Sequence, residues 1–153
     1  MTEANFYKKI KKKWKSISFI RIENRALLGT PDCLCQNSKG TFFTLELKLT
    51  KVNSVALSPH QCAFHMKHKK NTFVLVACSP ELGTCRLYSG SRILELVASG
   101  VKLEPLAEGL DACASVLERL WSWASPVWAR RVLLGNHFSG TRRCGCRGSL
   151  FCI

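Results

Sequence analysis

Acidic residues are scarce in this chain of 153 residues, which has 10 Asp and Glu against 23 Lys and Arg. Apolar runs are short, and none reaches the ~18–20 residues that a membrane-spanning helix needs. The basic N-terminus is followed by no apolar segment of the kind that a secretory signal contains. We therefore expect a cytoplasmic protein, in the host cell if it is viral, with no membrane-spanning segment.

The basic residues leave a formal net charge of +13 at pH 7, and this charge is uneven along the chain. Residues 1–70 contain 14 basic and 4 acidic residues, whereas residues 71–120 contain 4 basic and 6 acidic ones. Residues 121–153 contain 5 Arg and no acidic residue. Because so large a surplus attracts polyanions, it predicts a nucleic acid or an acidic membrane surface as the partner.

The nine cysteines are odd in number and scattered. Without a secretory signal, most of them are expected to be reduced thiols that pack as small apolar side chains. Cys33 and Cys35 fit this pattern as alternate residues on one face of a strand. Because 46% of the residues are hydrophobic, the chain can build a folded core.

An N-terminal helix is predicted over residues 2–15, with Thr2 as its cap. Apolar residues recur along one side of this helix at helical spacing, namely Phe6, Ile10 and Trp14. Basic residues cover the remaining sides of this helix. The candidates for contacts with phosphate are four of its lysines, Lys8, Lys9, Lys12 and Lys13, and two residues further along the chain, Arg21 and Lys51.

The remaining elements follow from apolar runs separated by turn-forming residues. Residues 31–36 and 41–49 are predicted to pair as an antiparallel hairpin around the turn at 37–40. Further strands are expected over 17–23, 72–78 and 84–88, and further helices from Ser58-Pro59 to about Lys69, over 91–98 and over 106–120. His60, His65 and His68 are expected on the surface of the helix that Ser58 begins, with His65 nearest its apolar side.

This order of elements predicts an α/β fold of the α+β type, with a central mixed sheet flanked by helices over residues 1–100. Residues 101–153 are expected to form a C-terminal helical extension rich in Arg and Trp. The tryptophans there could contact nucleic acid, form a dimer contact or cap the core. The end after Gly135 could be disordered.

Two acidic residues and a lysine are predicted to meet on the hairpin. In a hairpin centred on residue 39, Asp32 lies opposite Glu46 within a residue of register, and Lys48 lies on the same face as Glu46. The alternate residues Leu45, Leu47 and Leu49 face the core. Adjacent carboxylates repel each other unless a cation bridges them, so the group is either a solvated salt-bridge cluster or a divalent-metal site for phosphodiester hydrolysis.

A family resemblance favours the second interpretation. Gly29-Thr30-Pro31-Asp32, Glu46-Leu47-Lys48 and Ser58-Pro59-His60-Gln61 resemble the signature of PD-(D/E)xK nucleases, in particular the VRR-NUC type and phage Holliday junction resolvases. The resemblance spans about residues 2–90 and implies a restriction-endonuclease-like core. It also implies a DNA endonuclease active in DNA recombination, with Mg²⁺ as cofactor and Mn²⁺ as a substitute.

The resemblance implies a role for each matching residue. Asp32, Glu46 and the backbone carbonyl of Leu47 would hold the metal, and Lys48 would act on the attacking water or the scissile phosphate. Gln61 would orient Lys48 or the water, unless it is simply a polar residue at a helix start. The family usually has a further acid on its first helix, for which Glu3 is the candidate and Glu23 the alternative.

The resemblance further implies branched or duplex DNA as the partner and a homodimer as the active form. Three alternatives to a structure-selective nuclease stay open. One is a less selective nicking or restriction-type nuclease, and another is a non-catalytic nucleic-acid-binding protein. The third is a membrane-surface protein, which we place last because it leaves the hairpin carboxylates unexplained.

Overall fold

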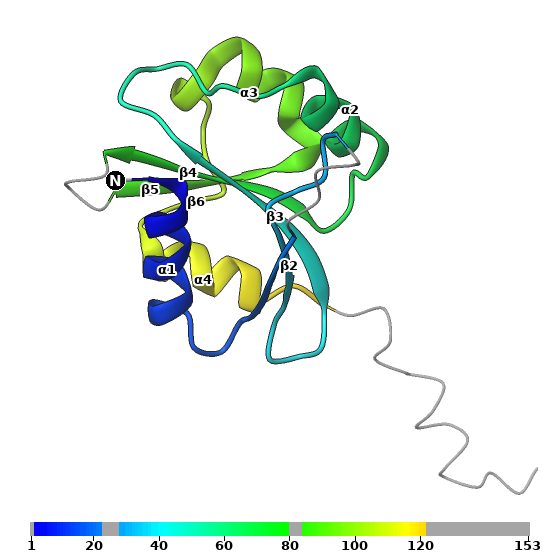
Figure 1. Ribbon diagram of the computed structural model, residues 1–153, viewed down its shortest axis with the longest axis vertical. Helices are drawn as coiled ribbons and strands as arrows, with labels where there is room; N and C mark the ends of the chain where they lie inside the picture. The colour runs from blue at the N-terminus through cyan, green and yellow to red at the C-terminus, as the bar shows by residue number, and fades with distance from the viewer. Residues whose placement is uncertain (1, 23–27, 80–83, 122–153) are drawn as a thin grey trace, which may run out of the picture. The chain divides into compact units, whose positions relative to one another are not determined.

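The computed structural model describes residues 2–22, 28–79 and 84–121, which form a mixed sheet with helices on both faces (Figure 1). This confirms the expected α+β architecture. Within the described ranges, six strands lie side by side in chain order, and only β3 and β4 are parallel neighbours. The strands are β1 (Ser18–Arg21), β2 (Cys33–Gln36), β3 (Phe42–Leu49), β4 (Thr72–Ser79), β5 (Thr84–Ser89) and β6 (Ala107–Glu108).

The helices form two layers. On one face of the sheet lie α1 (Glu3–Lys13) and α4 (Leu110–Glu118), and on the other lie α2 (Pro59–Lys67) and α3 (Ile93–Ser99), as Figure 1 shows. Short 3₁₀ turns flank α3 at η1 (Gly90–Arg92) and η2 (Gly100–Lys102). Each helix layer covers its own cluster of buried apolar residues.

Strand β4 is buried on both faces, as its continuous apolar sequence predicts. Phe73 and Leu75 pack in the cluster beneath α1 and α4, whereas Val74 and Val76 pack in the cluster beneath α2 and α3. Strand β3 differs because only one of its faces is apolar. Its alternate residues Leu45, Leu47 and Leu49 pack in the α1/α4 cluster, as expected.

Helix α1 begins where Thr2 caps it, with Thr2 Oγ1 accepting a hydrogen bond from Asn5 N at 3.2 Å. Its apolar side is buried through Phe6, Ile10 and Trp14, as the helical spacing predicts. The indole Nε1 of Trp14 also donates to the carbonyl oxygen of Leu110 at 3.0 Å. The first helix is thereby fixed to the start of α4.

The part of the chain after residue 100 contributes to the same core. Strand β6 pairs with β5, and Cys113 and Leu117 of α4 are fully buried under α1. The turn residue Asn37 donates from Nδ2 to the carbonyl oxygen of Leu117 at 3.0 Å. One compact unit spans Met1–Ser122. The extension expected to start at residue 101 therefore overlaps the core, and its remainder lies outside the described residues.

The helix expected over residues 106–120 is shorter in the structure, because a strand precedes it. Residues 107 and 108 pair with β5, and α4 begins only after Gly109, whose φ of +89° suits glycine. In the described ranges no helix is long and apolar enough to cross a membrane.

Candidate active site

The hairpin register places the two expected acids at one point of the sheet. Cys33 pairs with Leu45 and Leu34 with Thr44, so one further step along the register places Asp32 opposite Glu46. This is the pairing that the turn at residues 37–40 predicts. Asp32 is also fixed to β3, because its Oδ2 accepts a hydrogen bond from the backbone N–H of Leu47 at 2.7 Å.

Glu46 is the most unusual charged residue of the described chain, because its side chain is only 1% exposed. Its Oε1 lies 3.0 Å from Lys48 Nζ and also accepts a hydrogen bond from Gln61 Nε2. Its Oε2 is buried and has no hydrogen-bond partner among the described residues. A buried acceptor without a partner is costly, so this oxygen is suited to a ligand.

The charge state of Glu46 reflects this environment. Burial, and then the charge of Asp32, raise the pKa of Glu46 to about 7, while Lys48 acts in the opposite direction. Glu3 adds a smaller repulsion that also raises this pKa. The first-helix acid expected from the resemblance therefore influences Glu46, although its own side chain is exposed in the first turn of α1. Its alternative, Glu23, lies outside the described residues.

The first turn of helix α2 places Gln61 next to Glu46. Ser58 and Gln61 form a capping box, in which Gln61 N donates to Ser58 Oγ at 3.2 Å and Ser58 N donates to Gln61 Oε1 at 3.0 Å. Pro59 occupies the first turn, where its missing N–H is not needed. With Oε1 held by the cap, the amide nitrogen of Gln61 points to Glu46. The resemblance implies that Gln61 orients Lys48 or the water, and the structure shows that its amide contacts the Glu46 oxygen that Lys48 also contacts.

The Gly29-Thr30-Pro31-Asp32 turn packs against the same helix start. Gly29 has a φ of +85°, and a Cβ there would collide with the backbone carbonyl of His60. Only glycine allows both the turn and this close approach. The three sequence segments that carry the family resemblance are therefore in contact with one another through Asp32, Glu46 and α2.

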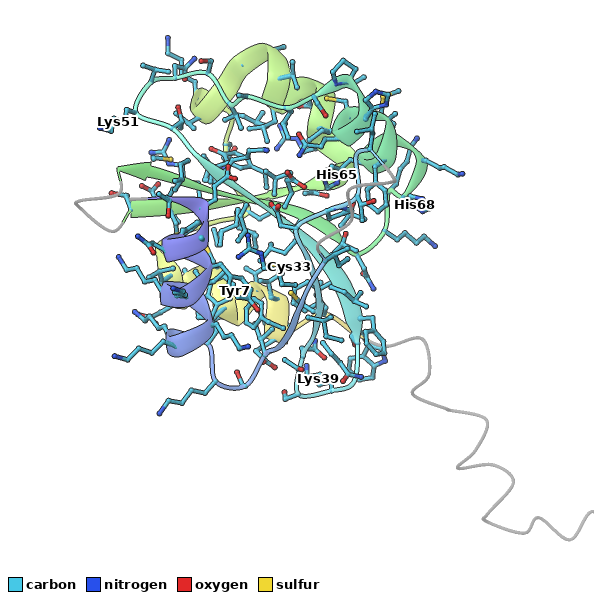
Figure 2. All side chains as sticks on the ribbon, in the orientation of Figure 1. Tyr7, Cys33, Lys39, Lys51, His65 and His68 are labelled. Atoms are coloured by element: carbon cyan, nitrogen blue, oxygen red, sulfur yellow. The ribbon has the colours of Figure 1, made fainter. Side chains whose placement is uncertain are left out.

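Two further residues lie near the acids of the site. Cys33 is buried next to the acids, and burial followed by the charge of Asp32 raises the pKa of its thiol to about 12, so it stays protonated. Arg21 of β1 partly offsets this effect, and its guanidinium carbon lies 5.5 Å from the ring centroid of Tyr7. Figure 2 labels Tyr7 and Cys33. Alternation along β2 predicts that Cys33 is buried, but not that it adjoins two carboxylates.

The lysines proposed to contact phosphate are exposed. Lys8, Lys9 and Lys12 are exposed on α1. Lys51, labelled in Figure 2, follows the end of β3. Lys13 differs, because its Nζ forms an ion pair with Asp111 Oδ2 on α4 at 2.8 Å.

The three histidines of the α2 segment differ in their exposure to solvent. His60 and His68 are exposed as expected, whereas His65 is 1% exposed, which corrects its expected surface position.

The donor set is consistent with a hard divalent cation. Asp32, Glu46 and the Leu47 carbonyl offer only oxygen atoms, and Mg²⁺ binds one or two carboxylates and completes its shell with water and substrate phosphate. Among the described residues there is no group of three or more His, Cys, Asp or Glu side chains suited to a metal. A zinc-type site is therefore not found there, whereas the unpartnered Glu46 Oε2 fits the two-carboxylate arrangement.

Comparison with known proteins adds no relative: no family model, curated protein or solved structure matches the chain.

Proposed function

We propose that the protein is a divalent-metal-dependent DNA endonuclease that hydrolyses phosphodiester bonds. One observation carries the proposal: Glu46 is a buried carboxylate with one oxygen that has no partner in the described chain. The solvated salt-bridge cluster that the sequence also allowed does not account for a carboxylate that is 1% exposed. A ligand that neutralises the adjacent acids does account for it.

In this proposal, Asp32, Glu46 and the Leu47 carbonyl hold Mg²⁺, or Mn²⁺ in its place. When bound, such an ion lowers the pKa of a coordinated water and polarises a phosphate oxygen. Lys48 is mostly buried beside Glu46, where its ammonium group orients the attacking water or neutralises charge on the phosphate. Gln61 holds the Glu46 carboxylate in place, and it is therefore a positioning residue.

The charge of the chain supports DNA as the substrate. Residues 1–70, which contain every proposed site residue, hold 14 basic and 4 acidic residues. Exposed lysines on α1 would hold the phosphates without reading the bases. We therefore propose branched DNA, including Holliday junctions, as the preferred substrate and a homodimer as the active form, on the basis of the family resemblance.

The decisive experiment is a cleavage assay with the full chain. Four-way junctions, plain duplex and single strands are incubated with Mg²⁺ or with EDTA, using the wild type, Asp32→Asn and Lys48→Ala. We expect metal-dependent cutting, strongest on junctions, that both variants reduce by at least a hundred-fold. Lys102→Ala, which removes an exposed lysine on η2, is the control and should cut normally.

The exposed lysines also fit a non-catalytic nucleic-acid-binding protein. In that case DNA binding would persist in Asp32→Asn and Lys48→Ala, and no substrate would be cut by the wild type with Mg²⁺ or Mn²⁺. That result would refute the proposed endonuclease.

A further inference from the structure

A pocket of about 210 Å³ is lined by residues of β2, β3, β4 and α2, and three of these elements also carry or adjoin the proposed active site. Strands β2, β3 and β4 form its floor through Leu34, Thr44 and Thr72, and the end of α2 forms a wall through Phe64 and His68. Pockets for drug-sized ligands enclose roughly 300–1,000 Å³, so this pocket suits a smaller group, such as one planar ring system.

The pocket and the proposed site share their supporting elements. On β3, Thr44 lies two residues before Glu46 and therefore on the same face, about 7 Å along the strand. On β2, Leu34 has the same relation to Asp32. The distance from the acids to the pocket is thus close to the span of one nucleotide in an extended strand.

Helix α2 also connects the proposed site to the pocket. Gln61 contacts Glu46, and Phe64 and His68 follow at three and seven residues, on the same side of the helix. The two rings are already in contact, with centroids 4.6 Å apart at an interplanar angle of 40°. His68 lies just beyond the end of α2 and is exposed (Figure 2). The wall is therefore an aromatic surface that is formed before any ligand binds.

The surroundings of the pocket are basic. Lys67 and Lys69 are exposed on either side of His68, and Lys70 lines the pocket. Aromatic rings beside basic residues are the combination that binds single-stranded nucleic acid, because bases stack on the rings while the cations attract phosphates. A base in a continuous duplex is stacked on its neighbours and cannot enter such a pocket, whereas an unpaired base can.

We propose that this pocket binds one unpaired nucleobase of the DNA strand whose phosphate lies at Asp32 and Glu46, and that it favours substrates with unpaired bases. The proposal rests on the proposed endonuclease function and specifies its substrate. The base stacks on the exposed ring of His68, which Phe64 supports from its other side, and its adjoining phosphate reaches the carboxylates two residues along β3. Junctions, flaps and single-stranded gaps meet this requirement, and intact duplex does not.

The test measures binding in Ca²⁺ in place of Mg²⁺, so that a divalent ion neutralises the two carboxylates and only binding, not cleavage, is read. Duplexes with a short single-stranded flap carry either 2-aminopurine or an abasic site at one flap position at a time. At one position we expect the wild type to quench 2-aminopurine fluorescence on binding. Removal of that base should weaken the affinity by about ten-fold or more, as expected for one base stacked on an aromatic side chain.

Two variants assign this effect to the pocket. Phe64→Leu keeps an apolar side chain for folding, and His68→Ala removes an exposed ring, so both should fold. Each should bind the intact flap more weakly than the wild type and become insensitive to the abasic site. Leu94→Ala, which truncates an exposed residue on α3, should keep the full sensitivity.

The possible failures are distinguishable. If the wild type binds abasic and intact flaps equally at every position, the base pocket is wrong, even when Mg²⁺-dependent cleavage is observed. If cleavage is absent but the base sensitivity is present and depends on Phe64, the proposed endonuclease fails and the nucleobase pocket stands. Absence of both DNA binding and cleavage overturns both proposals.

Discussion

Gln61 on α2 donates a hydrogen bond to Oε1 of Glu46 on β3, and the same oxygen pairs with Lys48 at 3.0 Å. Both donors therefore meet one oxygen, and Oε2 has no partner in the described chain. Because the side chain is buried and held from two sides, the direction of this oxygen is fixed by the fold. A preorganised acceptor of this kind binds a cation without the cost of ordering a flexible side chain.

The contact between Gln61 and Glu46 can be separated from the helix cap to which Gln61 also belongs. Ser58→Ala and Gln61→Ala both break the capping box, which costs about 0.5–2 kcal/mol of stability. Only Gln61→Ala also removes the hydrogen bond to Glu46. We expect cleavage by Gln61→Ala to be about 10–100-fold slower than cleavage by Ser58→Ala at similar thermal stability. Equal rates would show that Gln61 serves the helix alone.

Glu46 is expected to make the metal-free protein less stable as the pH rises. Its pKa is raised from 4.5 to about 7, chiefly by burial, so the folded state holds this proton more tightly than the unfolded state. Its stabilising contribution is complete below pH 4.5 and is lost as the pH rises through about 7, a change of about 3 kcal/mol. Thermal unfolding in EDTA from pH 4.5 to 8 measures it. Glu46→Gln should lack this loss of stability. If the stability of the wild type and of Glu46→Gln changed with pH in parallel, the loss would not be due to Glu46.

His65 is expected to act in the opposite direction. Burial lowers its pKa from 6.5 to about 4, and neither ring nitrogen has a partner in the described chain. The neutral ring is therefore favoured in the folded state, and its contribution is present above pH 6.5 and lost as the pH falls through about 4. Chemical unfolding at pH 7 and pH 4.5 should show a smaller loss in His65→Leu than in the wild type. An equal loss would place the acid sensitivity elsewhere.

The exposed lysines of α1 are expected to control the salt dependence of DNA binding. Each phosphate contact that is lost lowers the slope of log affinity against log salt by about 0.9 for duplex DNA. Lys8→Gln combined with Lys12→Gln should therefore reduce the slope by up to about 2, while Lys102→Gln leaves it unchanged. Titrations from low to moderate salt measure the slopes. An unchanged slope in the double variant would exclude α1 from the DNA interface.

The hairpin and its acids were predictable because the information is local. Turn-forming residues at 37–40 fix the register, and the register alone places Asp32 opposite Glu46. The apolar run of β4 likewise predicts burial on both faces. By contrast, β6 is two residues long and exists through its pairing with β5, so no local pattern distinguishes it from the start of a helix.

The details of the site depend on tertiary contacts. The polar start of α2 predicts a cap at Ser58, but whether Gln61 contacts Glu46 or Lys48 depends on how α2 packs on the sheet. His65 is similar, since Gly90 packs so closely against it that a Cβ on Gly90 would collide with the side chains of His65 and Thr72. A histidine on a short helix gives no sign of such a contact in the sequence.

The bonds from Trp14 to Leu110 and from Asn37 to Leu117 also affect how the chain folds. Each joins residues that are at least 80 positions apart, so the layer formed by α1 and α4 closes only when nearly the whole described chain is available. Contacts of this sequence separation slow folding. During synthesis, α1 can pack on β3 before α4 is made, but this helix layer stays incomplete until α4 has left the ribosome, and a chain ending near residue 100 would leave its apolar core partly uncovered and tend to aggregate.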